Sequence, residues 1–207
     1  MPRIAAAKVR AVSAVALEAH ALGTLQYIRA SIEAASQLVV PGSAGIAMGA
    51  VGLLAAVLCA WPALAPHWLR IWLAAAVAAF PCGSALIAQQ SLRSGRALFR
   101  GPARKFLFCL FPPLCVGLIL TVQLWPGAQR LIPAVWLMMY GCGVLAVSTM
   151  TVRPVALMGA LFLGLGLVAF GLPPAWQNLL LGAGFGGLHI VFGLIIGAGR
   201  SGASRGQ

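Results

Sequence analysis

The stretch NLLLGAGFGGLHIVFGLIIGAG, from Asn178 to Gly199, contains no acidic residue, lysine or arginine along its whole length. A bilayer core about 30 Å thick is crossed by roughly 20 helical residues, so this stretch is long enough to span a membrane. The sequence therefore predicts a transmembrane helix over about residues 175–198.

Five further apolar runs of similar length precede it, with proline and glycine in the gaps between them. They cover about residues 43–61, 67–90, 106–125, 131–151 and 154–171. Of the 207 residues, 61% are hydrophobic and only 8% are charged, too few to cover a soluble domain. We therefore predict an all-α integral membrane protein, a six-transmembrane-helix bundle of three helical hairpins, in a domain over residues 41–198.

The segments outside this domain are more polar. Residues 1–12 form a basic N-terminal segment, and residues 199–207 are expected to be a disordered tail. Between residues 13 and 40, apolar residues recur at helical spacing and polar ones largely occupy another face. This pattern predicts an amphipathic helix lying along the inner membrane surface.

The basic residues indicate the orientation, because cytoplasmic loops carry an excess of lysine and arginine. With the N-terminus inside, only Arg70 and Arg130 lie on the outer side. The inner side carries Arg3, Lys8, Arg10, Arg29, Arg93, Arg96, Arg100, Arg104, Lys105, Arg153, Arg200 and Arg205. The sequence thus predicts both termini in the cytoplasm, and an inner face that contacts anionic lipid headgroups rather than nucleic acid.

The tryptophans give an independent indication of the same orientation, since indole rings prefer the membrane interface. Four of them lie at predicted outer ends of spans: Trp61, Trp68, Trp125 and Trp176. Trp72 and Trp136 lie about one turn further in, and none falls at an inner end.

Glycines at four-residue spacing occur in the first and last predicted spans. The pairs are Gly45 and Gly49, Gly182 and Gly186, and Gly193 and Gly197. Small residues at this spacing let helix backbones approach closely in lipid. We expect close helix packing within the bundle, with a dimer interface as the alternative.

His189 lies near the middle of the last span, where an ionisable side chain is a candidate functional group. His189 is a candidate ligand for a cofactor such as haem, although the sequence shows no second ligand for it. The alternative is that its imidazole makes a hydrogen bond to a neighbouring helix. Tyr140, Ser148 and Thr149 could join it in lining a polar pocket, or could bond between helices. No metal site and no other cofactor are expected.

Glu18 and Glu33 are the only acidic residues in the chain. On one straight helix they would stand about 22 Å apart, too far to act on one substrate. No hydrolase or nucleotide-binding motif stands in the strand–turn–helix context that its chemistry requires, so we expect no catalytic residues and no enzyme. We expect Glu18 or Glu33 to dock the amphipathic helix onto basic residues of the inner loops, among them Arg93, Arg100 and Arg104, while Arg29 can pair with Glu33 within that helix.

Five segments of the sequence are distinctive: YIRASIEAA and VPG near the start, then GPARKF, LMMYGCGVL and GFGGLHIVFGLII. In these segments the chain resembles a family of uncharacterised bacterial six-span inner-membrane proteins. The resemblance runs from about Leu25 to Gly197, and Ser43 departs from it where relatives carry a bulky aromatic residue. It implies a bacterial inner-membrane location and carries no known activity.

Three functions remain open from the sequence. The first is a non-enzymatic membrane subunit, sensor or adaptor with a protein partner, which fits the absence of catalytic groups. The second is a transporter or channel for a small neutral or lipophilic solute, because no charged residue lies deep in a span to couple ions. The third is a haem-binding membrane protein that uses His189.

Overall fold

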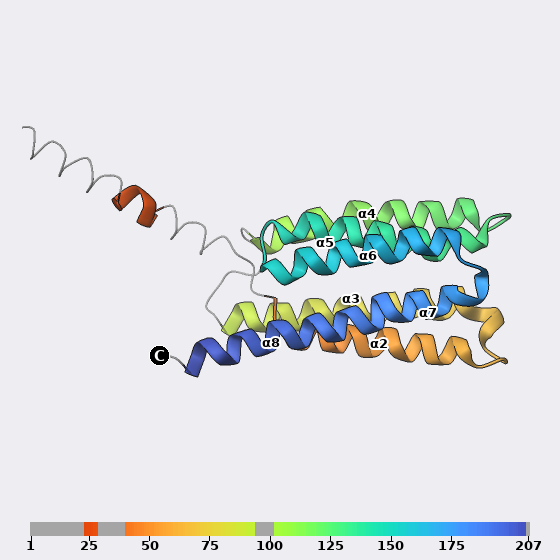
Figure 1. Ribbon diagram of the computed structural model, residues 1–207, viewed down its shortest axis with the longest axis horizontal. Coiled ribbons are helices and arrows are strands. Elements are labelled where there is room, and N and C mark those ends of the chain that lie inside the picture. Colours follow the sequence, from red (N-terminus) through yellow and green to blue (C-terminus); the bar gives the residue numbers. More distant parts are fainter. Residues whose placement is uncertain (1–22, 29–39, 94–101, 206–207) are drawn as a thin grey trace, which may run out of the picture. The chain divides into compact units, whose positions relative to one another are not determined.

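A computed structural model describes residues 23–28, 40–93 and 102–205 (Figure 1). The chain divides into two units, Met1–Gln37 and Leu38–Gln207, each of which is described by itself. In the first unit, residues 23–28 form a short helix with exposed side chains. The remainder of the predicted amphipathic helix, with Glu18, Arg29 and Glu33, lies outside the described residues.

The second unit contains six apolar helical spans, and its described residues include no strand. The first five spans are α2 (Gly42–Ala60), α3 (Trp68–Arg93), α4 (Pro102–Leu124), α5 (Ile132–Ser148) and α6 (Arg153–Gly171). The last span is built from α7 (Gln177–Leu181), the π-helical η4 (Gly182–Leu188) and α8 (His189–Arg205). The predicted all-α six-helix architecture is confirmed, and the chain is a multi-pass membrane protein.

Proline begins several of these helices. It is tolerated in the first turn because the N–H that it lacks would have no partner there. Pro133 and Pro154 lie in the first turns of α5 and α6, and Pro174 opens the 3₁₀ turn η3 (Pro174–Trp176) before α7. Two other 3₁₀ turns, η1 (Ala65–His67) and η2 (Gln129–Leu131), lead directly into α3 and α5.

The end of the last span differs from the prediction. A disordered tail was expected from residue 199, whereas α8 continues to Arg205. No proline interrupts this segment, so each further residue can add one backbone hydrogen bond to a helix that already exists.

The spans form two groups of three (Figure 1). We call these groups layers. The first layer consists of α2, α3 and the last span, with α2 packed between the other two. The second layer consists of α4, α5 and α6, with α5 packed between the other two. The predicted hairpins of α2 with α3 and of α4 with α5 are therefore packed pairs. The predicted third hairpin, of α6 with the last span, is not a packed pair. Although the two follow each other in the chain, α6 packs mainly on α5 and the last span mainly on α2.

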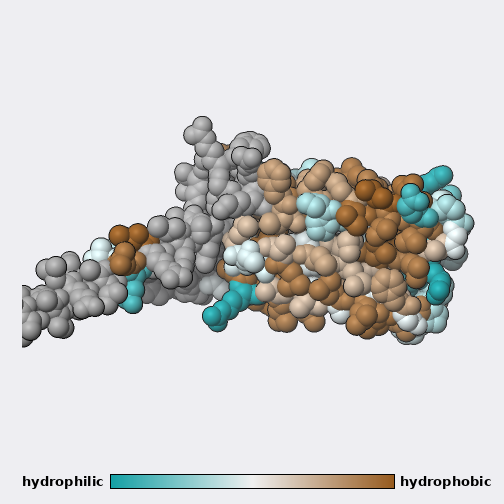
Figure 2. Space-filling view, turned by 90° about the horizontal axis from the view of Figure 1, so that it is seen from above, coloured by the Kyte–Doolittle hydropathy of each residue, from teal (hydrophilic) through white to brown (hydrophobic). Residues whose placement is uncertain are grey.

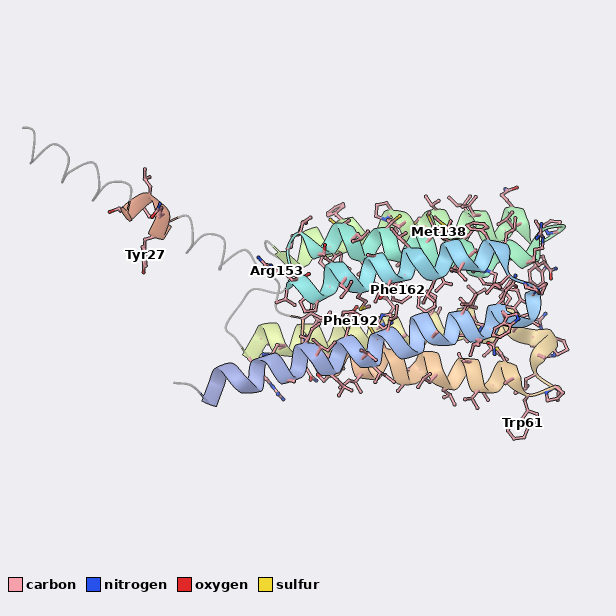
Figure 3. All side chains as sticks on the ribbon, viewed as in Figure 1. Tyr27, Trp61, Met138, Arg153, Phe162 and Phe192 are labelled. Atoms are coloured by element: carbon pink, nitrogen blue, oxygen red, sulfur yellow. The ribbon has the colours of Figure 1, made fainter. Side chains whose placement is uncertain are left out.

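The spans alternate in direction, so the same end of the bundle collects the turns after α2, α4 and α6. Trp61, Trp125 and Trp176 lie there with exposed rings, and Figure 3 labels Trp61 at this end. Arg153 begins α6 at the opposite end, where α3 ends at Arg93. The layers also run antiparallel to each other, because the central helices α2 and α5 point in opposite directions.

Glycines bring α2 and the last span into backbone contact in the first layer. A Cβ added to Gly45 would lie 2.9 Å from the carbonyl oxygen of His189, and one added to Gly49 would lie 2.7 Å from that of Gly186. At Gly193, an added Cβ would lie 2.7 Å from the oxygen of Gly42. Such short distances leave no room for a side chain, so these glycines act within one chain.

The second layer uses the same kind of contact between α5 and α6. A Cβ on Gly141 would lie 3.0 Å from the oxygen of Gly159, and one on Gly166 would lie 3.0 Å from the nitrogen of Met138. These glycines do not form the four-residue pairs that marked the first and last spans, so the sequence pattern did not single them out.

The sides of the bundle are apolar. Figure 2 shows hydrophobic residues over most of the visible side of the bundle and hydrophilic ones gathered towards its end. Large exposed side chains on several helices contribute, among them Leu54, Val77, Phe111, Val122 and Leu167. A surface of this kind is expected of helices that face lipid tails.

Candidate functional site

The two layers meet in a core of apolar side chains, which we call the seam. Its buried members are Ala134, Leu137, Met158, Phe162, Ala169, Leu180, Leu181 and Phe192. Leu137 and Phe162, from the second layer, are both 0% exposed. In Figure 3, Phe162 and Phe192 lie in the space between the layers.

A hydrogen bond between two helices crosses this apolar seam. The hydroxyl of Tyr140, on α5, and Nε2 of His189, at the start of α8, lie 2.7 Å apart. His189 is only 4% exposed. The sequence singled out both residues, and the structure brings them together.

Aromatic rings enclose the pair. The ring centroid of Tyr140 lies 4.8 Å from that of Phe162 and 5.1 Å from that of Phe185. The imidazole of His189 meets Phe162 edge-on at 5.5 Å and stacks with Phe185 at 6.3 Å. Edge-to-face contacts at these separations add to the stabilisation that burial alone provides.

The other imidazole nitrogen has no such partner. Nδ1 of His189 is buried and makes no hydrogen bond of good geometry, although the carbonyls of Gly184 and Phe185 interact with the ring. Both carbonyls belong to η4, the π-helical part of the last span. A polar atom buried without a hydrogen bond is rare in folded proteins and calls for an explanation.

The π-helical segment is permitted by its sequence, GAGFGGL, which is mostly glycine. Glycine adopts unusual backbone angles at little steric cost, and π-helical turns inside α-helices are frequent at functional sites. The segment sets Phe185 and His189 against the second layer. The sequence predicted one uninterrupted helix here, and the run of glycines was the signal for the π-helical turn.

The space beside the pair is closely filled. A Cβ on Gly184 would lie 2.7 Å from Cδ2 of Leu137 and 3.0 Å from Cε1 of Phe162. The ring of His189 is thus enclosed by side chains from the opposite layer.

Ser148 and Thr149 do not join this group. Their hydroxyls donate to carbonyls of their own helix region, Ser148 to Leu145 at 2.7 Å and Thr149 to Ala146 at 2.8 Å. Both lie where α5 ends, and Thr149 is exposed. Their spacing in sequence placed them about two turns from Tyr140, too far to share its surroundings.

Hydrogen bonds from two tryptophans connect helices within the layers; the sequence drew attention to Trp72, Trp136, Thr121 and Asn178 but did not pair them. In the first layer, Nε1 of Trp72 donates to Oδ1 of Asn178 at 3.2 Å, and Nδ2 of Asn178 donates to the carbonyl of Ala56 at 2.9 Å. In the second layer, Nε1 of Trp136 donates to Oγ1 of Thr121 at 2.8 Å. Thr121 in turn donates to the carbonyl of Gly117 at 2.8 Å.

A further side-chain bond runs between the layers near the tryptophan-rich end. Nε2 of Gln177, at the start of α7, donates to the carbonyl of Arg130 in η2. Gln177 is buried. Together with the Tyr140–His189 bond, it links the last span to η2 and α5 of the second layer at two depths.

The predicted docking set can be placed only in part. Arg93 ends α3 with an exposed side chain, and Arg104 lies in the first turn of α4. Arg29, Arg100, Glu18 and Glu33 lie outside the described residues. The docking of the amphipathic helix stays a prediction.

Chemically, the site offers hydrogen bonding and aromatic surface. Its polar atoms are the Tyr140 hydroxyl and the two imidazole nitrogens, inside a shell of phenylalanine rings. Comparison with protein-family models, with curated proteins and with solved structures found no match to this chain.

Proposed function

We propose that this multi-pass membrane protein is a non-enzymatic subunit or adaptor of a bacterial cytoplasmic membrane, with both termini in the cytoplasm. The observation that carries the proposal is how the polar side chains in the described bundle are used. Asn178, Thr121 and Gln177 all bond between helices, and the Tyr140–His189 pair does the same. Side chains committed to such bonds serve assembly of the bundle rather than chemistry on a substrate.

The charge distribution supports the proposed orientation and points to the contact surface. Arg93 and Arg153, both exposed, lie at the end of the bundle opposite the exposed tryptophans. Basic residues next to a span attract anionic lipid headgroups by about 1 kcal/mol each. The same surface is suited to an acidic segment of a protein partner.

A second candidate function is transport of a small neutral or lipophilic solute. It is favoured by the antiparallel layers, with an irregular helix at mid-depth where they meet. Many secondary transporters bind substrate at such a place, between inverted groups of helices. The haem hypothesis gains no comparable support, because Nε2 of His189 is bonded to Tyr140 and aromatic rings enclose the imidazole.

Purification of the full-length protein from its own membranes in mild detergent, followed by native mass spectrometry, tests the proposal. We expect a complex that contains a second polypeptide at fixed stoichiometry. Replacing Arg93 and Arg153 with glutamine should release that polypeptide. The matched control replaces Arg70 and Arg130, at the other end of the bundle, and should leave the complex intact.

Two results would count against the adaptor proposal. One is a protein that carries only lipid in every preparation. The other is a small neutral molecule that co-purifies with the wild type and is lost from the Tyr140→Phe variant, which would favour transport.

A further inference from the structure

In each layer, one pair of helices is in backbone contact: α2 with the last span, and α5 with α6. Gly45 of α2 meets the backbone of His189, and Gly141 of α5 meets that of Gly159, whereas the close contacts of Gly83 with Met48 and of Gly143 with Leu110 are with side chains. At the seam, the close contacts of Gly184 are with the side chains of Leu137 and Phe162. Backbone contacts of this kind hold helices in one register, whereas side chains can repack by changing rotamer.

Each layer also contains side-chain hydrogen bonds between its own helices. The Trp72–Asn178–Ala56 bonds connect all three spans of the first layer. The Trp136–Thr121 bond connects two spans of the second, where glycine packing secures the third. Each layer is therefore held together independently of the other.

The layers are joined mainly along one side. The spans of α5 and α6 contact the last span, while α3 and α4, at the other side of their layers, make few close contacts with each other. Burial follows this arrangement: 11% of the α3 span and 17% of the α4 span are buried, against 56% for α5 and 44% for the last span. Because the layers are in contact mainly along this side, one layer can rotate relative to the other about the seam.

Two side-chain hydrogen bonds between described residues cross the seam. They are the Tyr140–His189 bond and the bond from Gln177 to the carbonyl of Arg130. The π-helical segment Gly182–Leu188 ends immediately before His189, so the last span is not a regular helix where it meets the second layer.

From these observations we infer that the two layers move relative to each other as rigid units about the seam. The Tyr140–His189 hydrogen bond stabilises the closed arrangement, in which the layers are packed together. Parting the layers would break this bond, while the backbone contacts inside each layer stay in place. The inference concerns motion in the bundle and does not depend on which proposed function is correct.

Thiol labelling of the purified full-length protein tests this inference. All five native cysteines are first replaced, and Leu137, which faces Gly184 across the seam, becomes the single reporter as Leu137→Cys. The rate of reaction with N-ethylmaleimide then measures how often the seam opens. Adding Tyr140→Phe should raise this rate about tenfold, the factor that corresponds to about 1.4 kcal/mol.

The matched control is Thr121→Val, which removes a hydrogen bond of nearly equal length inside one layer. It should leave the rate at the Leu137→Cys reporter unchanged. A second reporter retains only Cys59, which is buried in the first layer and should stay unreactive in every variant.

Gln177→Ala provides a second test if Tyr140→Phe proves unstable, and it too should accelerate labelling at the seam. Equal acceleration by Thr121→Val, or acceleration at Cys59 by Tyr140→Phe, would mean general loosening and would overturn the inference. An unchanged rate in both Tyr140→Phe and Gln177→Ala would overturn it as well.

Discussion

Replacing Phe162 with alanine is expected to lower the free energy of unfolding by about 3–5 kcal/mol, the range for a fully buried phenylalanine. Its side chain is 0% exposed and contacts the rings of Tyr140, Phe185 and His189. Those rings come from both layers, so the cavity would open at the seam itself. Thermal unfolding in detergent, followed by the loss of the monodisperse peak on gel filtration, measures the effect.

The matched control is Phe111→Ala, in the α4 span. Phe111 is 65% exposed on the side of the bundle, where detergent or lipid can fill the space that the ring leaves. Its replacement should change the unfolding temperature little. Equal destabilisation by both substitutions would show that Phe162 does not occupy a packed seam.

The second large effect is expected from Gly193→Ala, although it adds only one methyl group. The new Cβ would lie 2.7 Å from the carbonyl oxygen of Gly42 and 2.8 Å from the backbone nitrogen of Ile46. Backbone atoms cannot rotate away, so α2 and α8 must separate. Overpacking of this kind typically lowers stability by about 1–3 kcal/mol, and we expect the upper end of that range.

Gly164→Ala is the corresponding control. It makes the same chemical change within the α6 span, where an added Cβ meets nothing within 4 Å. We expect unchanged or slightly raised stability, because alanine favours the helix more than glycine does. Comparable losses for Gly164→Ala and Gly193→Ala would contradict the close contact between α2 and α8.

The number, length and class of the spans could be predicted from the sequence because each follows from local composition. A run such as Asn178–Gly199 has to satisfy its backbone hydrogen bonds within itself, whatever lies next to it. The glycine spacing also marked the close contacts of Gly45, Gly49 and Gly193, since small residues at that spacing let helices approach in membranes, whereas a Cβ added to Gly197 would meet nothing within 4 Å.

The pairing of helices could not be predicted in the same way. In a membrane-spanning helix nearly every residue is apolar. The face that packs on other helices and the face that contacts lipid therefore have the same composition, and the sequence does not distinguish them. Phe162 and Phe111 lie in similar apolar surroundings in the sequence, although one is fully buried and the other faces outward. Chain order favoured a hairpin of the last two spans, whereas glycine contacts place α8 against α2.

The candidate site was predicted in part for a similar reason. His189 stood out because a histidine is unusual in the middle of an apolar span, and Tyr140 because it is polar. Neither residue revealed the other as its partner, since they come from spans that are distant in sequence. Ser148 and Thr149 are polar as well, but hydroxyls near a helix end find carbonyls of their own chain segment.

The most direct test of the two-layer arrangement is a disulfide between its first and last spans. An added Cβ at Gly182 would lie 2.8 Å from the Cβ of Ala56, whereas a disulfide requires about 3.8 Å, so only a small adjustment is needed. In a background without native cysteines, Ala56→Cys with Gly182→Cys should oxidise within one chain and shift its mobility on a non-reducing gel as a monomer. The control pair, Ala56→Cys with Gly164→Cys, should stay reduced. No cross-link, or one found only between two chains, would contradict the packing of α2 against the last span.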